Sequence, residues 1–401
     1  MKLVHSLKQH PTIHLLGLSS ILSYGLLFYA FALLKAPLAQ FAGTSEQAIM
    51  TALSIAFLIK ALSAPWVGKL VDRHGALRAL AIGLFLGGVG LASLTAFAAE
   101  WWIWVCFLPI SLGYSMATYE VAFGAAVQYD ETHSRRNISI ITFYGGVASS
   151  LTWLGLGLLL PWLGLSGATL IAGLALMGLA LVLHPKRNDS AAVKGSEQDH
   201  TPFSWHELKG SERRALVTLA AVGVLHELVF GATSLLFISW FILQGFGAET
   251  AVVLAAVDGP FQVIGRVLEM RFGASIDARY TGTLAITMVA IALLLLLPNQ
   301  LVLTVLAMAI FGMGNGVVTV SSGYVVNMYF RAQVYGRAKG LITAPRSLGS
   351  AIAPALGIAL FDQLGGNHFL LMALLCGIAA LFFSTLLKLR AVQGSLLRGE
   401  V

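Results

Sequence analysis

Charged residues are scarce in this sequence. Only 11% of its 401 residues are Asp, Glu, Lys or Arg, whereas a soluble domain carries about 25%. Hydrophobic residues make up 57% of the chain, and the mean hydropathy is +0.82. A composition this apolar excludes an ordinary soluble globular protein.

Cysteine is also rare, and both cysteines, Cys106 and Cys376, lie inside long apolar runs. Cysteines in such runs usually serve as small apolar side chains, so we expect neither a disulfide nor a metal site. The stretch HELVF at 226–230 begins like a zinc-protease motif, but Phe230 stands where the second histidine would be. The glycine-rich GMGNG at 312–316 follows no strand, and the sequence has no phosphate-binding loop. We therefore expect no enzyme, no cofactor and no ATP-driven pump.

Long apolar runs are abundant. Each is close to the roughly 20 residues that a helix needs to cross about 30 Å of hydrocarbon. The first run is too long for a signal-peptide core and is followed by no small-residue cleavage site. The sequence therefore predicts an all-α polytopic membrane protein with twelve transmembrane helices, at 12–34, 47–67, 79–99, 101–125, 138–161, 165–184, 215–241, 249–268, 281–298, 301–327, 341–361 and 369–387.

The positive charges indicate an orientation. All but four of the 25 Lys and Arg residues lie in the termini and loops of one side; the exceptions are Lys35, Lys60, Arg266 and Arg346. The positive-inside rule then places both termini in the cytoplasm of a multi-pass inner-membrane protein. The net charge of +7 matches anionic inner-leaflet lipid and needs no nucleic acid. We expect a monomer whose partners are the lipid bilayer, a small-molecule solute and protons.

The chain contains an internal repeat. GKLVDRHG at 68–75 and GRVLEMRFG at 265–273 share glycine, acid, arginine and glycine, and RR at 135–136 is matched by GR at 336–337. Both spacings are close to half of the chain length, which is typical of transporters built by duplication. We therefore predict two pseudo-symmetric six-helix bundles, at 1–184 and 214–401, joined by a polar cytoplasmic loop at 185–213.

The first of these loops, GKLVDRHGALR, resembles the signature loop of the major facilitator superfamily. Gly68, Asp72, Arg73, Gly75 and Arg78 fall on the positions of that pattern. The resemblance implies alternating access, with Asp72 closing an inner gate against the start of the eleventh helix and a loop arginine such as Arg136. By the same resemblance, we expect Glu269 and Arg337 to be the gating residues of the second copy. The alternative is that the basic residues only anchor the topology.

Shorter stretches indicate a narrower bacterial group, distantly similar to monocarboxylate and oxalate carriers. These are YGLLFYAF at 24–31, YEVAF at 119–123, GPFQVIGRVLE at 259–269 and GMGNG. Monocarboxylate carriers have an Asp followed four residues later by Arg in the eighth helix. Here Asp258 is present, but position 262 is Gln, which removes a fixed cation for a lactate-like substrate. The fifth helix also lacks the Gly-Pro pattern common in drug/proton antiporters.

We single out six ionisable residues inside or close to predicted spans, where an ionised group costs about 2.5–3.5 kcal/mol. We expect them to face the bundle interior, a partner or water. Glu227 and Asp258 lie near the middle of their helices, where reversible protonation or solute contact would suit a carboxyl group. The other four are Lys60, Glu120, His226 and Arg346.

For those four, more than one role stays open. His226 points about 100° away from Glu227 on a helix and is either a structural histidine or a ligand. Lys60 and Glu120 lie at similar depths and are predicted to pair, for structure or for transport. Arg346 either reaches the cytoplasmic vestibule or meets an anionic solute.

The resemblance implies that helices one, four, seven and ten line the cavity. Tyr24, Tyr119 and Asn315 lie on those helices, and we add Gln262 and Arg346 as candidate cavity residues. We expect a proton-coupled secondary transporter of a small polar or amphipathic solute that works by alternating access, with export favoured. The alternatives are an uptake symporter of an organic anion, such as a monocarboxylate, and a transporter-like sensor that binds without moving its ligand.

Overall fold

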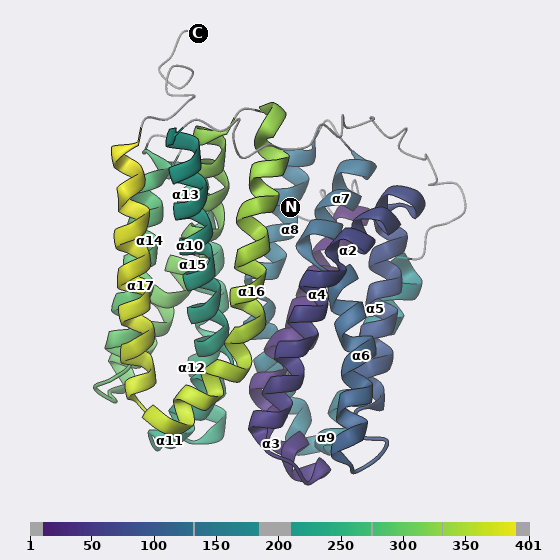
Figure 1. Cartoon of the computed structure of the whole chain (residues 1–401). Helices are drawn as coiled ribbons and strands as arrows, with labels where there is room; N and C mark the ends of the chain where they lie inside the picture. Colours follow the sequence, from purple (N-terminus) through teal and green to yellow (C-terminus); the bar gives the residue numbers. More distant parts are fainter. Residues whose placement is uncertain (1–10, 131–132, 184–209, 274–275, 331, 390–401) are drawn as a thin grey trace, which may run out of the picture. The chain divides into compact units, whose positions relative to one another are not determined.

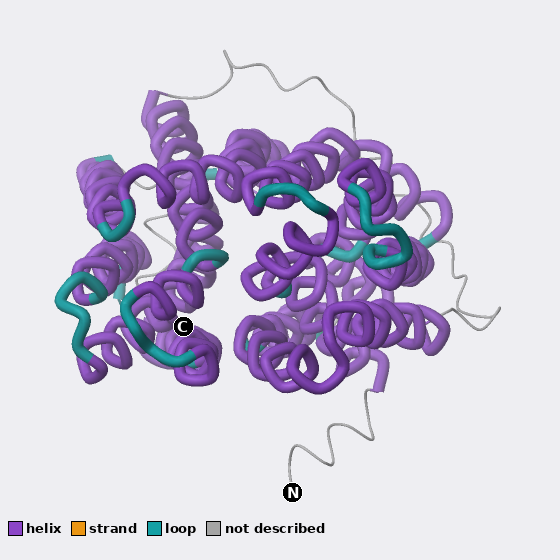
Figure 2. The backbone as a smooth tube through the Cα atoms, turned by 90° about the horizontal axis from the view of Figure 1, so that it is seen from below, coloured by secondary structure: helices purple, strands orange, loops and turns teal. Residues whose placement is uncertain are grey.

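The computed structural model describes residues 11–130, 133–183, 210–273, 276–330 and 332–389. Within these residues the regular structure is helical, with no strand (Figure 2). Most of the predicted central loop, 185–209, lies outside the described residues. The contacts between residues divide the chain into two compact units: unit 1 is Met1–Gln198 with Phe237–Ala256, and unit 2 is Asp199–Leu236 with Val257–Val401. The sequence-based boundary differs, because it assigns 237–256 to the second bundle.

The helices of both units are labelled in Figure 1. Unit 1 contains α2 (Pro11–Tyr24), the π-helix η1 (Gly25–Tyr29), α3 (Phe31–Ala42), α4 (Glu46–His74), α5 (Ala76–Ser93), α6 (Glu100–Met116), α7 (Tyr119–Tyr129), α8 (Ser134–Gly146), α9 (Ala148–Leu183), α11 (Phe237–Leu243) and α12 (Ala248–Ala256). Unit 2 contains α10 (Gly210–Ser234), α13 (Asp258–Phe272), α14 (Ala278–Leu295), α15 (Leu301–Tyr329), α16 (Ala332–Leu364), α17 (Asn367–Thr385) and the short 3₁₀ helix η4 (Leu386–Lys388).

Ten helical segments of the described residues are long and apolar enough to cross a membrane. One of them, Arg136–Leu183, is 48 residues long and contains two predicted spans. It turns at Gly164, whose φ of 64° is a left-handed conformation that glycine adopts without steric cost. The predicted span 101–125 forms α6 and α7, each shorter than 18 residues. These two differences explain why the described residues hold ten long apolar segments where the sequence predicts twelve runs. Each predicted run lies mainly on helix.

The junction of α4 and α5 explains one glycine of the signature loop. Gly75 ends α4 with a φ of +87° and leads directly into α5, a turn that disfavours any other residue. The first backbone N–H of α5, on Ala76, donates to Gln128 Oε1 at 2.9 Å. The sequence GALR therefore begins a new helix because glycine permits the reversal and a side chain satisfies the helix N-terminus.

Glycines bring the helices of unit 1 into backbone contact. A side chain at Gly83 would lie 2.8 Å from the carbonyl oxygen of Gly113 on α6, and one at Gly88 would lie 2.6 Å from that of Gly173 on α9. The run GLFLGGVG at 83–90 is therefore the surface through which α5 meets α6 and α9. Small residues permit such close approach between apolar helices.

Residues 237–256 join unit 1 through polar contacts as well as apolar ones. Lys35 on α3 is 1% exposed, and its ammonium donates to Ser239 Oγ on α11 at 2.6 Å. Its Nζ also lies 3.8 Å from the carboxylate of Glu46. The hydroxyl of Ser150 on α9 donates to the carbonyl of Ala256 at 2.5 Å. These bonds explain why α11 and α12 belong to unit 1 although α10 belongs to unit 2.

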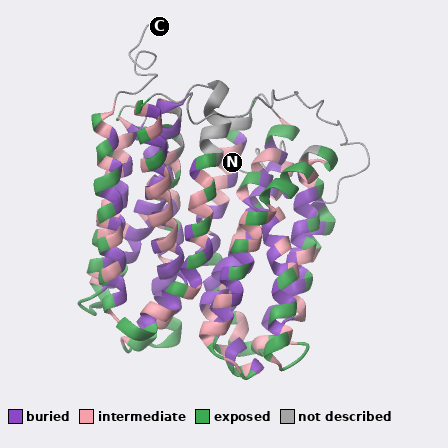
Figure 3. Ribbon diagram, viewed as in Figure 1, coloured by how far each residue is buried: buried purple, intermediate pink, exposed green. Residues whose placement is uncertain are grey.

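In unit 2, α10 packs closely along α16 through four glycines. A side chain at Gly349 would meet the carbonyl of Val224 at 2.6 Å, and one at Gly231 would meet the methyl group of Ala353 at 2.7 Å. Gly223 and Gly357 contribute to the same interface. Along the described side chains of α16 buried positions are interspersed with exposed ones (Figure 3), whereas α10 beyond Val217 is buried or half-buried throughout. The contact between α10 and α16 positions the charged pair described next.

Candidate functional site

Glu227 on α10 and Arg346 on α16 form an ion pair. Arg346 donates from Nε to Glu227 Oε1 at 2.7 Å, and its Nη2 donates to the same oxygen. The Glu227 side chain is 21% exposed and the Arg346 side chain is 39% exposed. Gly223, one turn before Glu227, leaves room for the aliphatic part of Arg346, whose carbons lie about 3.5 Å from the space a Cβ would take. Two residues with separate roles in the sequence interpretation thus form one partly accessible unit.

His226, the neighbour of Glu227, faces α15. Its Nε2 lies 3.0 Å from Asn315 Oδ1, and the Asn315 amide donates to the carbonyl of Phe311 at 2.9 Å. Because the amide nitrogen donates to Phe311, the amide oxygen faces the imidazole and accepts a hydrogen bond from His226 Nε2–H. His226 and Asn315 are buried. The contact links α10 to α15, which favours the structural role for His226.

A polar ladder runs along α13. Asp258, Gln262 and Arg266 are spaced four residues apart and are 1%, 4% and 4% exposed. Gln262 donates from Nε2 to Asp258 Oδ2 at 2.8 Å and accepts from Arg266 Nη2 at 3.3 Å. Gln262 therefore connects Asp258 to an arginine one turn further along.

Arg266 is absent from the sequence-based candidates, although its spacing contains the necessary signal. Residues four apart share a helix face, so an acid, an amide and a base at 258, 262 and 266 lie in one row. A buried cation therefore exists on the eighth predicted span, displaced by one turn from the expected position.

The motif GMGNG on α15 has two functions in packing. A side chain at Gly312 or Gly316 would collide with the carbonyl oxygens of Asp258 and Gln262, respectively. A side chain at Gly314 would lie 2.8 Å from the carbonyl of Ala285 on α14. The glycines thus allow α15 to touch α13 and α14, and they position Asn315 opposite His226.

Unit 1 contains an aromatic cluster beside a π-helix. Tyr24 is the last residue of α2, before η1 at Gly25–Tyr29. Its ring centroid lies 4.5 Å from that of Tyr119 and 5.9 Å from that of Tyr114, and its hydroxyl accepts from the Tyr119 backbone N–H at 3.3 Å. Single-turn π-helices occur frequently at functional sites. Tyr24 and Tyr119, both candidate cavity residues, are thus brought together.

Lys60 contacts the same cluster. Its ammonium lies 4.6 Å from the centre of the Tyr114 ring, a cation–π distance. Among the ion pairs of the described residues, none joins Lys60 to Glu120, which is exposed on the first turn of α7. An aromatic face stabilises an ammonium without desolvating a second charge, so the expected pairing is replaced by a contact with Tyr114.

The candidate gating residues occupy helix ends. Arg73 and Arg78 flank Gly75 and are exposed, as is Arg136 in the first turn of α8, while Gly68 on α4 has open space beside it. The side chains of Asp72 and Arg337 lie outside the described residues. Glu269, at the end of α13, is 5% exposed and accepts from Thr281 Oγ1 at 2.7 Å. The gate between Asp72 and its partners stays a prediction.

A second group that the sequence interpretation missed lies at the start of α14. Arg279 donates to both carboxylate oxygens of Asp277, to the hydroxyl of Tyr329, and to the carbonyls of Leu386 and Leu389. Burial alone would raise the pKa of Asp277, but the hydrogen bonds and charge of Arg279 outweigh it and hold that pKa below its ordinary value. Arg279 therefore fixes the ends of α14, α15 and η4 together.

Comparison with known proteins gives a family match and a similar fold. The family model described as Major Facilitator Superfamily matches residues 16–268. The chain is similar to a solved structure described as a crystal structure of a POT family transporter in complex with a thioalcohol-conjugated peptide, with a TM-score of 0.73, 13% sequence identity, and coverage of 95% of this chain and 96% of that one. At this identity the likeness shows the fold alone. A search of curated protein sequences finds no match.

Proposed function

The chain belongs to the major facilitator superfamily and is a multi-pass membrane transporter, and we propose that it is a proton-coupled secondary carrier of a small polar or amphipathic solute. It works by alternating access as a monomer in an inner membrane, with both termini in the cytoplasm and without a cofactor. Export is the favoured direction. The solute and proton sites lie on the helices that carry Glu227, Asp258 and the cluster around Tyr24.

The observation that carries the proposal is the ion pair between Glu227 and Arg346. An ionised carboxylate and a guanidinium stabilise each other in a partly dry site, and protonation of the carboxylate removes that attraction. Because the pair joins α10 to α16, gain or loss of one proton changes how strongly these helices are held together. Proton binding is thereby linked to a rearrangement within unit 2.

Export is favoured because the two arginines within the predicted spans of unit 2 already have partners. Arg346 is held by Glu227, and Arg266 donates to Gln262. A solute without a carboxylate needs neither guanidinium. The second candidate, uptake of an organic anion with a proton, is supported by the same pair, since protonation of Glu227 would release Arg346 to bind a solute carboxylate.

The test is solute-dependent proton flux in proteoliposomes that contain a trapped pH-sensitive dye. Candidate solutes come from a thermal-shift screen of metabolites and drugs at two pH values. Protons should move against the solute for export by antiport and with it for uptake by symport. Glu227→Gln should abolish the coupled flux, whereas Glu249→Gln, the loss of an exposed carboxylate on α12, should leave it intact.

Two results would contradict the proposal. Full proton-coupled flux in Glu227→Gln would exclude Glu227 as the coupling group. A wild-type protein that binds its solute in the thermal-shift assay but moves none of it would be a sensor.

A further inference from the structure

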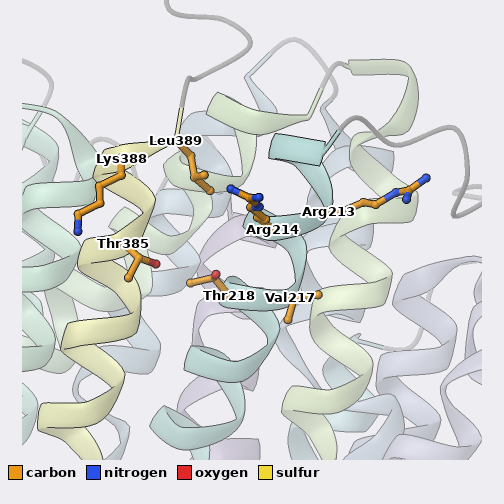
Figure 4. Close-up of a pocket in the computed structure, with 7 residues that line it drawn as sticks. All are labelled: Arg213, Arg214, Val217, Thr218, Thr385, Lys388 and Leu389. Carbon is orange, nitrogen blue, oxygen red and sulfur yellow. The ribbon is translucent and has the colours of Figure 1, made fainter.

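A pocket of about 460 Å³ opens at one end of unit 2. It lies between the first turns of α10 and the end of α17 with η4 (Figure 4). None of its residues takes part in the transport site proposed above. Its lining consists of Arg213, Arg214, Val217, Thr218, Thr385, Lys388 and Leu389.

The lining combines positive charge with apolar surface. Three of the seven side chains are cationic and none is acidic. In Figure 4 the guanidinium of Arg214 lies between the two helices, with the side chains of Thr218 and Thr385 below it, and the Thr385 hydroxyl donates to the Phe382 carbonyl. Arg213 and Lys388 lie on the two flanks, and in this view their charged ends extend outward, so Arg214 is the cation nearest the middle of the pocket. A ligand with an anionic head that accepts hydrogen bonds, attached to an apolar body, matches this surface.

The apolar surface continues along both helices away from the charged end. Val217 on α10 is 54% exposed, and Leu381, one turn before Thr385 on the same face of α17, is 70% exposed. Aliphatic side chains this exposed on membrane-spanning helices provide a path along which an acyl chain can lie. The geometry therefore fits an amphiphile better than a free anion.

The wall of the pocket formed by η4 is held in place independently of any ligand. Arg279 donates to the carbonyls of Leu386 and Leu389 at 3.1 and 3.0 Å, and the Tyr329 hydroxyl donates to the Leu386 carbonyl at 2.6 Å. These bonds fix Lys388 and Leu389 relative to α14 and α15. Because the wall is already ordered, ligand binding does not carry the entropic cost of forming it.

We propose that this pocket binds the phosphate head group of an anionic phospholipid from the cytoplasmic leaflet. The leaflet follows from the proposed orientation, in which the α10 start and the α17 end face the cytoplasm. Arginine binds phosphate through paired N–H donors, and basic pockets between transmembrane helices on that side are suited to anionic head groups. The lipid would clamp α10, which carries Glu227, to α17.

The test is lipid binding by the full-length protein in detergent, measured by native mass spectrometry during titration with phosphatidylglycerol. Phosphatidylcholine is the neutral reference. Arg214→Gln and Lys388→Gln should each weaken phosphatidylglycerol binding by about fivefold, and the double variant by about 25-fold. Arg271→Gln is the matched control, because Arg271 is an exposed arginine at the end of α13 outside the pocket. It should bind as the wild type does.

Further arms of the experiment distinguish a bound lipid from a soluble anion and from diffuse surface charge. Inorganic phosphate and glycerol phosphate should not displace the bound lipid, and displacement by either would assign the pocket to a soluble anion. Equal loss of binding in Arg271→Gln would show diffuse attraction to surface charge and overturn the proposal. If Arg214→Gln fails to fold, Lys388→Gln at an exposed position is the deciding variant, and unchanged phosphatidylglycerol binding in it would overturn the proposal. The readout is binding, so a failed transport assay would leave it unaffected.

Discussion

The guanidinium of Arg346 donates twice to one carboxylate oxygen of Glu227, across the contact between α10 and α16. The two residues are 119 positions apart in the sequence. Both side chains are partly accessible, which places their interaction between an exposed pair and a fully desolvated one. The pair is therefore neither fully screened by solvent nor fully desolvated.

We predict that Glu227→Gln and Arg346→Gln each lower the free energy of unfolding by about 1–3 kcal/mol, between the values for exposed and buried pairs. The double variant should lose less than the sum, because each single variant already breaks the same pair. Chemical unfolding of the purified protein in detergent measures all three. Additive losses would mean that the two side chains do not interact.

His226 and Asn315 provide a second double-variant test. Asn315→Ala leaves a buried imidazole N–H without its acceptor and should cost about 1–3 kcal/mol of unfolding free energy. His226→Ala in the Asn315→Ala background should then cost less than it does in the wild type. The free energies of unfolding are measured as for the first pair. An equal cost of His226→Ala in the wild type and in the Asn315→Ala background would contradict the contact.

The two kinds of glycine in unit 2 predict opposite effects of alanine. Gly316→Ala places a methyl group against the Gln262 carbonyl on α13 and should destabilise the protein by about 1–3 kcal/mol. Gly377→Ala on α17 has open space beside it, and it should be neutral or stabilising by up to about 1 kcal/mol. Melting temperatures of the two variants give the comparison. A harmless Gly316→Ala would contradict the close approach of α13 and α15.

Asp277 predicts an acid dependence of stability. Its folded pKa is held below its ordinary value by Arg279, so its contribution is complete above the unfolded pKa of about 3.9 and is lost as the pH falls through the folded pKa. Asp277→Asn should therefore be less stable than the wild type at neutral pH, and the difference should shrink as the solution is acidified.

The measurement is the free energy of unfolding as a function of pH. Asp362→Asn, which removes an exposed carboxylate on α16, is the control for the loss of one negative charge. A constant difference between wild type and Asp277→Asn across the acid range would show that Asp277 and Arg279 do not interact as described.

The sequence predicts the helical class well because membrane insertion is a local property. Whether a run such as 301–327 enters hydrocarbon depends on the transfer free energies of its own residues, and α15 spans Leu301–Tyr329. The turn at Gly75 is also a local property, because it depends on the backbone freedom of a single glycine. The break at Gly164 is local as well: the backbone is non-helical there, between the predicted spans 138–161 and 165–184, and it divides α9 into two helices.

The side-chain partners are much harder to predict. Lys60 and Glu120 lie at matched depths on neighbouring spans, yet the ammonium contacts Tyr114, because depth leaves the rotation of each helix open. The sequence places Lys35 near an outer edge, yet Lys35 is buried against Ser239. Arg266 is not among the predicted site residues, because the resemblance to monocarboxylate carriers directs attention to position 262, one turn earlier.

The amino-acid order alone determined which segments are apolar helices, since hydrophobicity is a property of consecutive residues. It also marked the acids and bases that an apolar environment must accommodate. Which of them meet was decided by the tertiary structure, where glycines bring α10 onto α16 and α13 onto α15. Glu227 and Arg346, or His226 and Asn315, are joined by the rotation and close packing of distant helices, and no local pattern encodes that rotation.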